Sequence, residues 1–411
     1  MKKNILFSLC LVVVLVFAGC AKDIDEDTPN NPPIKETGLF KGVIKECRLT
    51  KEELINELCE QIPAIESAKP ILSLLLSDLN FATIRYTTTG ADGNVVEASG
   101  VVVYRADVTE YDHILSIQHG THDIADAPSL TTFNIELAPA IKGEVVVMAD
   151  YLGYGISQTP TLQHPYLHTK LTGTTCADMI EAAEQYLDEK TSLTKTDDNI
   201  KLIGYSQGGA ATVATVLELE KRGYTDRIAE AYAGSGPYKV FSFITNYISD
   251  PDMEYERNGY FPFFFRGMAY GEHLTINDTN IYAPYLIEHG YHLLFSTTQL
   301  TELHEILGKR VGNVLHPDFY KTDFNGNEDI KKLVDAAERN SLTNYPAPHT
   351  PIKLYHSPHD TWVPYYNSAT LHQQWPNTTL IDLELTSHID CGVEFMLKYM
   401  GLWEIFQRFL E

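Results

Sequence analysis

The sequence has few basic residues, few cysteines and only one long apolar run. Its 411 residues include 31 lysines and arginines against 55 aspartates and glutamates, which gives a formal charge of −24. Such a surface repels phosphates over most approaches, which argues against a nonspecific nucleic-acid binder. No C-x-x-C spacing and no internal repeat is present. With 44% hydrophobic residues, the chain is neither disordered nor collagen-like, and it is long enough for a sizeable core.

The one long apolar run lies within residues 1–19, which we interpret as a signal peptide. Lys2 and Lys3 precede an apolar stretch that ends at Phe17, and Ala18-Gly19 then precede Cys20. The stretch is shorter than the ~20 apolar residues of a membrane span. It resembles a bacterial lipoprotein signal, which implies cleavage before Cys20 and lipid on its thiol. An ordinary signal peptide or an anchor helix is the alternative.

Residues 20–37 are acidic and proline-rich, and this composition predicts a flexible tether. The acidic run behind Cys20 also resembles the surface-export signal of some Gram-negative lipoproteins, with a plain solvated linker as the alternative. We therefore expect a lipoprotein anchored in the outer membrane, facing the periplasm or exposed on the cell surface. Its expected partners are the membrane and a small-molecule substrate, not nucleic acid.

Four cysteines remain after the signal, namely Cys47, Cys59, Cys176 and Cys391. An even number outside the cytoplasm is typical of disulfides, although four cysteines allow three pairings. A Cys47–Cys59 bond would be a local staple, and a Cys176–Cys391 bond would tie a helix to the C-terminal end. Buried thiols are the alternative.

The rest of the chain predicts an α/β core, residues 38–237 and 350–411, interrupted by an insertion over 238–349. Helical spacing is read over 34–80, and a hairpin over 81–104 turns at Gly90–Gly93. Apolar runs that alternate with helical patterns then predict a mostly parallel sheet with helices on both faces. The expected strands are 114–117, 145–148, 200–203, 229–234, 352–355 and 379–385, and the expected helices 175–188, the segment up to 221, and 392–410.

The insertion is rich in aromatic residues. From Tyr238 to Tyr345 it holds 19 of the 44 Phe, Tyr and Trp residues of the chain, most densely at Tyr260–Phe265. More than a hundred residues are too many for an unstructured loop, and 279–308 and 327–342 show helical periodicity. We expect a helical cap.

The sharpest motif runs from Gly204 to Gly209 (GYSQGG), between a predicted strand and a predicted helix. A serine on such a sharp turn projects its hydroxyl above the sheet, and glycines are needed around it because side chains would clash. This context predicts Ser206 as a nucleophile and the backbone N–H of Gln207 as an oxyanion donor. An anion-binding glycine turn is the alternative.

A serine nucleophile needs a base and a carboxylate that orients the base. Asp360 and His388 each follow a predicted strand, and the carboxyl ends of parallel strands are where such sheets place their sites. His356 and His359 are rival bases, and Asp390 is a rival acid.

The second oxyanion donor is expected in the loop after strand 114–117, where we predict the backbone N–H of Thr121, with His119 or Gly120 as alternatives. The sequence His119-Gly-Thr-His-Asp123 also suggests a metal site. It lacks the H-x-H and H-E-x-x-H spacings that place two imidazoles on one ion, so we expect no metal.

Together with the loop at His119 and the Asp150-Tyr-Leu-Gly-Tyr-Gly155 turn, the residues Ser206, Asp360 and His388 resemble the α/β-hydrolase superfamily over roughly residues 80–411. Within it, GYSQGG, the D-Y-x-G-Y-G turn and the long insertion resemble the secretory lipase family. The resemblance implies Ser-Asp-His chemistry without a cofactor and a cap over an acyl pocket. The expected function is a serine carboxylesterase or lipase. A serine peptidase of the same fold and a non-catalytic ligand-binding lipoprotein are the alternatives.

Overall fold

The computed structural model describes residues 38–61, 66, 69–131, 134–159, 163–247, 249–296, 299–404 and 407. The predicted signal peptide, Cys20 and the predicted tether lie outside these ranges. Within them, no helix combines the length and the apolar character needed to cross a membrane.

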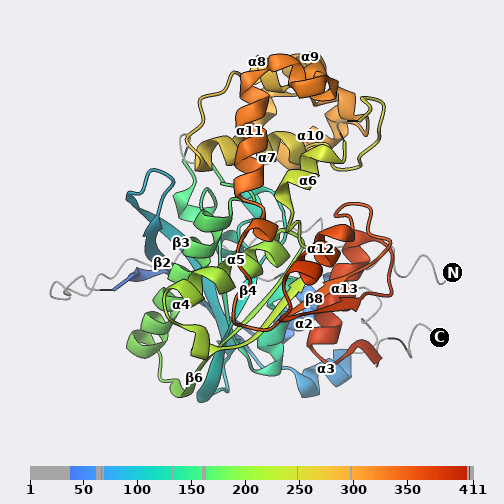
Figure 1. Ribbon diagram of the computed structural model, residues 1–411. Coiled ribbons are helices and arrows are strands. Elements are labelled where there is room, and N and C mark those ends of the chain that lie inside the picture. The colour runs from blue at the N-terminus through green and yellow to red at the C-terminus, as the bar shows by residue number, and fades with distance from the viewer. Residues whose placement is uncertain are drawn as a thin grey trace.

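A nine-stranded sheet forms the centre of the molecule (Figure 1), in the order β1-β2-β3-β5-β4-β6-β7-β8-β9. The pairs from β1 to β5 are antiparallel, and all pairs from β5 through β4 to β9 are parallel. The strands are β1 (Phe40–Leu49), β2 (Leu79–Thr89), β3 (Val95–Arg105), β4 (Glu110–Gln118), β5 (Val145–Ala149), β6 (Thr194–Tyr205), β7 (Ile228–Gly234), β8 (Ile352–His356) and β9 (Thr378–Asp382).

Helices cover both faces of the sheet, as its apolar strands require. In β5 every residue is buried: Val145 and Val147 belong to one hydrophobic cluster, and Val146 and Met148 to another. The first face carries α4 (Thr169–Lys190), α5 (Gln207–Lys221) and α12 (Tyr366–Gln374), and the second carries α2 (Lys51–Gln61) and α13 (His388–Tyr399).

The helical reading of residues 34–80 is wrong in part. Among the described residues of this range, α2 and α3 (Lys69–Leu75) are α-helices, whereas Phe40–Leu49 forms β1, which pairs antiparallel with β2 and places Cys47 opposite Phe81. β1 is a largely exposed edge strand, so its residues lack the continuous apolar run that marks the inner strands. The last helix also begins earlier than predicted, at His388, because the Ser387 hydroxyl accepts the Asp390 N–H and caps it.

The predicted disulfides are wrong, since all four cysteines carry thiols. Cys176 on α4 and Cys391 on α13 lie in the two separate hydrophobic clusters on opposite faces of the sheet, which precludes a bond between them. Cys59, Cys176 and Cys391 are buried, in agreement with the alternative of buried thiols.

The segment between β7 and β8 folds into helices that lie together above the sheet (Figure 1), and we call it the helical insertion. A helix near 327–342 is present as α11, but the predicted 279–308 helix is divided by turns at Pro284 and Gly290. The aromatic run at Tyr260 is itself a helix. The helices are α6 (Val240–Thr245), α7 (Tyr260–Gly271), α8 (Asp278–Ile281), α9 (Pro284–His289), α10 (Gln299–Leu307) and α11 (Glu328–Arg339).

Candidate active site

Ser206 occupies the sharp turn between β6 and α5. Its backbone has φ 60° and ψ −123°, a conformation that non-glycine residues rarely adopt, and its N–H donates to the Gly234 carbonyl at 2.8 Å. A Cβ at Gly208 would overlap the carbonyl oxygen of Gln118, so glycine is required where the helix passes the neighbouring strand. The strand, turn and helix predicted from GYSQGG are therefore all present.

Ser206, His388 and Asp360 form a continuous hydrogen-bond chain. The Nε2 atom of His388 lies 2.9 Å from the Ser206 Oγ, and its Nδ1 atom lies 2.6 Å from Asp360 Oδ2. The other carboxylate oxygen, Oδ1, accepts the backbone N–H groups of Trp362 at 2.9 Å and Val363 at 3.0 Å. Asp360 follows β8 and His388 follows β9, so the sheet brings together residues that are far apart in sequence.

The rival residues occupy other positions. The Nδ1 of His356 is hydrogen-bonded to the Ser368 hydroxyl at 2.7 Å, and its Nε2 is hydrogen-bonded to the Val363 carbonyl at 2.8 Å and lies 3.5 Å from Asp360 Oδ2. Both ring nitrogens of His356 therefore have partners other than the serine. His359 is exposed, and the carboxylate that bonds the imidazole of His388 belongs to Asp360 rather than Asp390.

The carboxylate of Asp360 is kept charged although it is buried. Burial alone raises its pKa, but hydrogen bonding with the His356 and His388 imidazoles lowers that pKa well below its usual range. The side chains of Asp360 and His388 are 0% and 3% exposed, so bulk water competes little for this pair. An anionic acceptor at Nδ1 leaves the lone pair of Nε2 directed at the serine.

Two contacts that the sequence did not indicate hold the His388 side chain and backbone. The Tyr205 hydroxyl donates to the His388 carbonyl at 2.8 Å, and the Trp362 indole stacks on the imidazole with 5.1 Å between ring centroids. The guanidinium of Arg257, from the helical insertion, lies 3.8 Å from the centroid of the same indole. Trp362 lies two residues after Asp360 in the sequence, whereas Arg257 is brought close only by the packing of the insertion.

The two predicted oxyanion donors are the backbone N–H of Gln207, the residue directly after the serine, and the backbone N–H of Thr121. In the described part of the chain, neither donates a hydrogen bond to a protein atom. The alternative donor Gly120 is engaged, because its N–H donates to Glu136 Oε1 at 3.0 Å. Burial raises the pKa of that Glu136 carboxyl to about 7.

Tyrosines of the D-Y-x-G-Y-G turn hold the loop that carries Thr121. The Tyr151 hydroxyl donates to the His119 carbonyl at 3.0 Å, and the Tyr154 hydroxyl donates to the His122 carbonyl at 2.8 Å. The rings of His119 and His122 stack 4.3 Å apart, and burial lowers the pKa of His122 to about 4. Among the described residues, no three His, Cys, Asp or Glu side chains are grouped so that they could hold a metal.

The side chain of Gln207 is anchored by His164. Its Nε2–H donates to His164 Nε2 at 2.8 Å, and the His164 Nδ1–H donates to the Leu152 carbonyl at 2.8 Å. Burial lowers the pKa of His164 to about 3, so the imidazole stays neutral and keeps this tautomer. Gln207, whose backbone N–H is the predicted oxyanion donor, is therefore held in place by its side chain.

A hollow in front of the serine, which we call the serine pocket, lies between the core and the helical insertion. The insertion contributes two tyrosines to its wall, Tyr255 and Tyr260, and most other lining side chains are apolar or aromatic. The lining residues are Tyr166, Leu167, Ser206, Pro237, Tyr255, Tyr260, Trp362, Val363 and His388.

The mostly parallel sheet, the serine at a strand-to-helix turn and the Asp and His after the next strands define an α/β-hydrolase fold. This confirms the predicted fold class.

Solved structures share this fold. The chain resembles a Legionella pneumophila protein with 22% identity and a TM-score of 0.68, covering 89% of this chain and 98% of that one. It resembles the rice cell wall degrading esterase LipA from Xanthomonas oryzae with 23% identity and a TM-score of 0.66, covering 88% and 96%. Candida antarctica lipase A in its closed state is 16% identical, with a TM-score of 0.58 over 87% and 79%. No protein-family model matches the chain, and no curated protein matches its sequence.

Proposed function

We propose that this protein is a serine hydrolase that cleaves carboxylic esters through an acyl-enzyme. The observation that carries the proposal is the hydrogen-bond chain from Ser206 through His388 to Asp360. The proposed oxyanion donors are the backbone N–H groups of Gln207 and Thr121, for which no protein acceptor is found among the described residues. A nucleophile, a base, an oriented carboxylate and oxyanion donors are the parts that acyl transfer needs.

Each step follows from these groups. His388 Nε2 takes the proton of the Ser206 hydroxyl as its oxygen attacks the ester carbonyl carbon. The backbone N–H groups of Gln207 and Thr121 donate to the oxyanion of the tetrahedral intermediate. The intermediate collapses, the protonated His388 gives its proton to the leaving alcohol, and the acyl group stays on the serine. Water then repeats the cycle and releases the carboxylic acid.

Because the wall of the serine pocket is largely aromatic, we expect the apolar acyl or alcohol group of the ester to bind there. Two neighbours in structure are named an esterase and a lipase, which supports an ester or lipid substrate. In this proposal the helical insertion acts as a cap that covers the reacting ester and excludes water.

We further propose a lipid anchor on Cys20 that holds the hydrolase at a membrane, facing the periplasm or on the cell surface. The signal-like residues 1–19 and the acidic stretch after them support this location. The Cys20→Ala variant tests the anchor: we expect it to leave the membrane fraction and to lose metabolic labelling by a fatty acid. Equal labelling and equal sedimentation of the variant would contradict the anchor.

An assay with nitrophenyl esters of graded chain length and an aminoacyl-anilide tests the reaction. We expect ester turnover by the wild type, little anilide turnover, and loss of ester turnover in Ser206→Ala. Absent wild-type turnover, or equal turnover by the variant, would overturn the proposal. Faster turnover of the anilide would favour a serine peptidase instead.

A further inference from the structure

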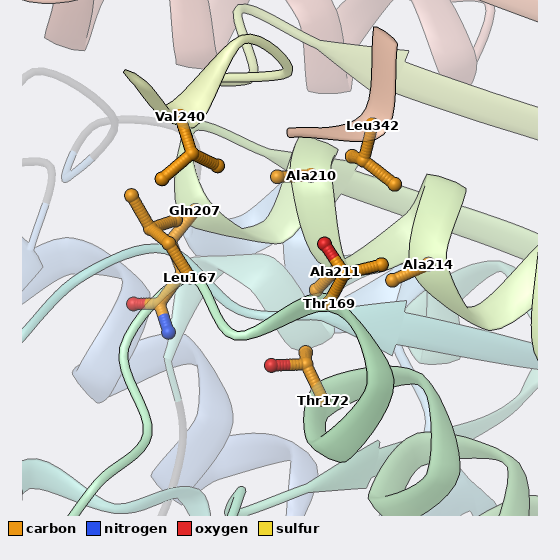
Figure 2. Close-up of a pocket in the computed structure, with 9 residues that line it drawn as sticks. All are labelled: Leu167, Thr169, Thr172, Gln207, Ala210, Ala211, Ala214, Val240 and Leu342. Carbon is orange, nitrogen blue, oxygen red and sulfur yellow. The ribbon is translucent and has the colours of Figure 1, made fainter. Parts of the chain in front are cut away.

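A second hollow lies next to the serine pocket, and the two share Leu167. It is bounded by α4, α5, the start of α6 and the residues after α11. Figure 2 shows Leu167 drawn beside Gln207, with Leu342 and Ala214 toward the other end. The side chains that line it are Leu167, Thr169, Thr172, Gln207, Ala210, Ala211, Ala214, Val240 and Leu342.

Leu167 has an unusual backbone. Its φ is 59°, a left-handed conformation that costs a leucine on the order of 1 kcal/mol, and such strain persists only where neighbours enforce it. The neighbours here are close: α7 packs on the segment through Gly267, where a Cβ would lie 2.5 Å from the Tyr166 nitrogen. The next residue, His168, accepts the Leu171 N–H and caps α4. Leu167 is thus held between the two hollows from both sides.

The second hollow is small, about 10 Å³, but its wall suits an apolar group, and truncation of Leu167 would supply most of the room that an alkyl chain needs. Its wall is made largely of short or aliphatic side chains, and the hydroxyl of Thr169 is already engaged with the Asn340 carbonyl at 2.7 Å. The side-chain amide of Gln207 donates an N–H to His164, while its Oε1 is buried with no partner found among the described residues. No charged side chain lines this space, so it would not favour an ionic group.

We propose that Leu167 sets the acyl-chain length of the ester, and that the second hollow is the extension of the acyl site that its side chain closes off. The proposal rests on the ester hydrolysis proposed above. An acyl group attached at Ser206 lies in the serine pocket, where Leu167 forms part of the wall. The wild type therefore takes short acyl groups, and a smaller residue at this position opens a path for further methylenes into the second hollow.

Two variants of Leu167 test the path. Leu167→Ala removes the side chain beyond Cβ, and Leu167→Gly does so while also accepting a φ of 59° without strain, which keeps a folded variant available. Initial rates are measured with nitrophenyl acetate, butyrate, octanoate and dodecanoate and divided by the active-site concentration from a phosphonate titration. Since each buried methylene contributes roughly fourfold to binding, we expect the octanoate-to-acetate ratio of kcat/KM to rise at least tenfold.

Two matched variants locate the extra methylenes. Leu342→Ala makes the same truncation in the second hollow but leaves Leu167 in place, so its octanoate-to-acetate ratio should stay at the wild-type value. Leu167→Ala combined with Ala214→Leu refills the hollow and should return the ratio toward that of the wild type.

The outcomes separate the two proposals. Ser206-dependent turnover with the same ratio in the wild type and both Leu167 variants would overturn the role of Leu167 alone. A double variant that keeps the raised ratio would show that the chain runs elsewhere and would overturn the second hollow as its site. Absence of any Ser206-dependent turnover in the wild type would overturn both the ester hydrolysis and the inference built on it.

Discussion

Replacing Asp360 by asparagine is the most informative single change, because it alters charge with little change in shape. The carboxylate accepts the Nδ1–H of His388 at 2.6 Å and two backbone N–H groups at 2.9 and 3.0 Å. An amide keeps one carbonyl oxygen for the backbone N–H groups, and its NH₂ then faces His388. That NH₂ donates, so Nδ1 must become the acceptor and the proton moves to Nε2, where it blocks transfer from Ser206.

The expected loss in kcat is roughly ten-thousand-fold, or about 5 kcal/mol, with little change in KM. Binding is retained because no serine-pocket side chain is altered. Stopped-flow and steady-state assays with nitrophenyl butyrate measure both constants, and circular dichroism confirms that the variant is folded.

Asp390→Asn is the matched control for this experiment. The residue lies in the first turn of α13, three positions from Ser387, whose hydroxyl accepts its N–H, and the same amide substitution there leaves the Asp360–His388 bond intact. We expect wild-type kcat within about twofold. A large loss in Asp390→Asn with an active Asp360→Asn would refute the assignment of the acid.

Three further predictions concern the turn, the buried acid and the thiols. Gly208→Ala should lower the melting temperature by several degrees or prevent folding, as a Cβ there meets a neighbouring carbonyl oxygen; an unchanged melting temperature would argue against so close an approach. The raised pKa of Glu136, about 7, means that its proton is held more tightly in the folded state, so its contribution to stability is present below pH 4.5 and is lost as the pH rises through 7. The Glu136→Gln variant still accepts the Gly120 N–H, so its melting temperature should fall less than that of the wild type between pH 4.5 and pH 7. An equal fall in the two proteins would contradict this. Reductant should leave the melting temperature unchanged, and a thiol reagent should react slowly with native Cys176 and Cys391, whose pKa burial raises to about 12; a reductant-sensitive transition would contradict the thiol assignment.

The inner strands and the serine turn could be predicted because their signals are local. Where a short apolar run is followed by a glycine-rich turn and a helical pattern, about twenty consecutive residues suffice to predict the strand, the turn and the helix, as at β6 and α5. The edge strand β1 could not be predicted in this way, since its pairing with β2 rather than its own pattern makes it a strand.

Some residues of the candidate site could likewise be predicted from the sequence, and others could not. Ser206, Asp360 and His388 follow strands whose order along the chain indicates their meeting at one edge of the sheet. Arg257 and Tyr255 come from the helical insertion, and their approach to Trp362 depends on how that insertion packs. No spacing in the sequence encodes this packing.

Covalent labelling of the serine tests the central claim most directly. The purified protein is treated with a fluorophosphonate, and intact mass, peptide mapping and residual turnover of nitrophenyl butyrate are followed together. We predict one adduct per chain, located on Ser206, with turnover lost in proportion to labelling and no adduct on Ser206→Ala. An adduct on another residue, or full turnover after Ser206 is blocked, would contradict the account.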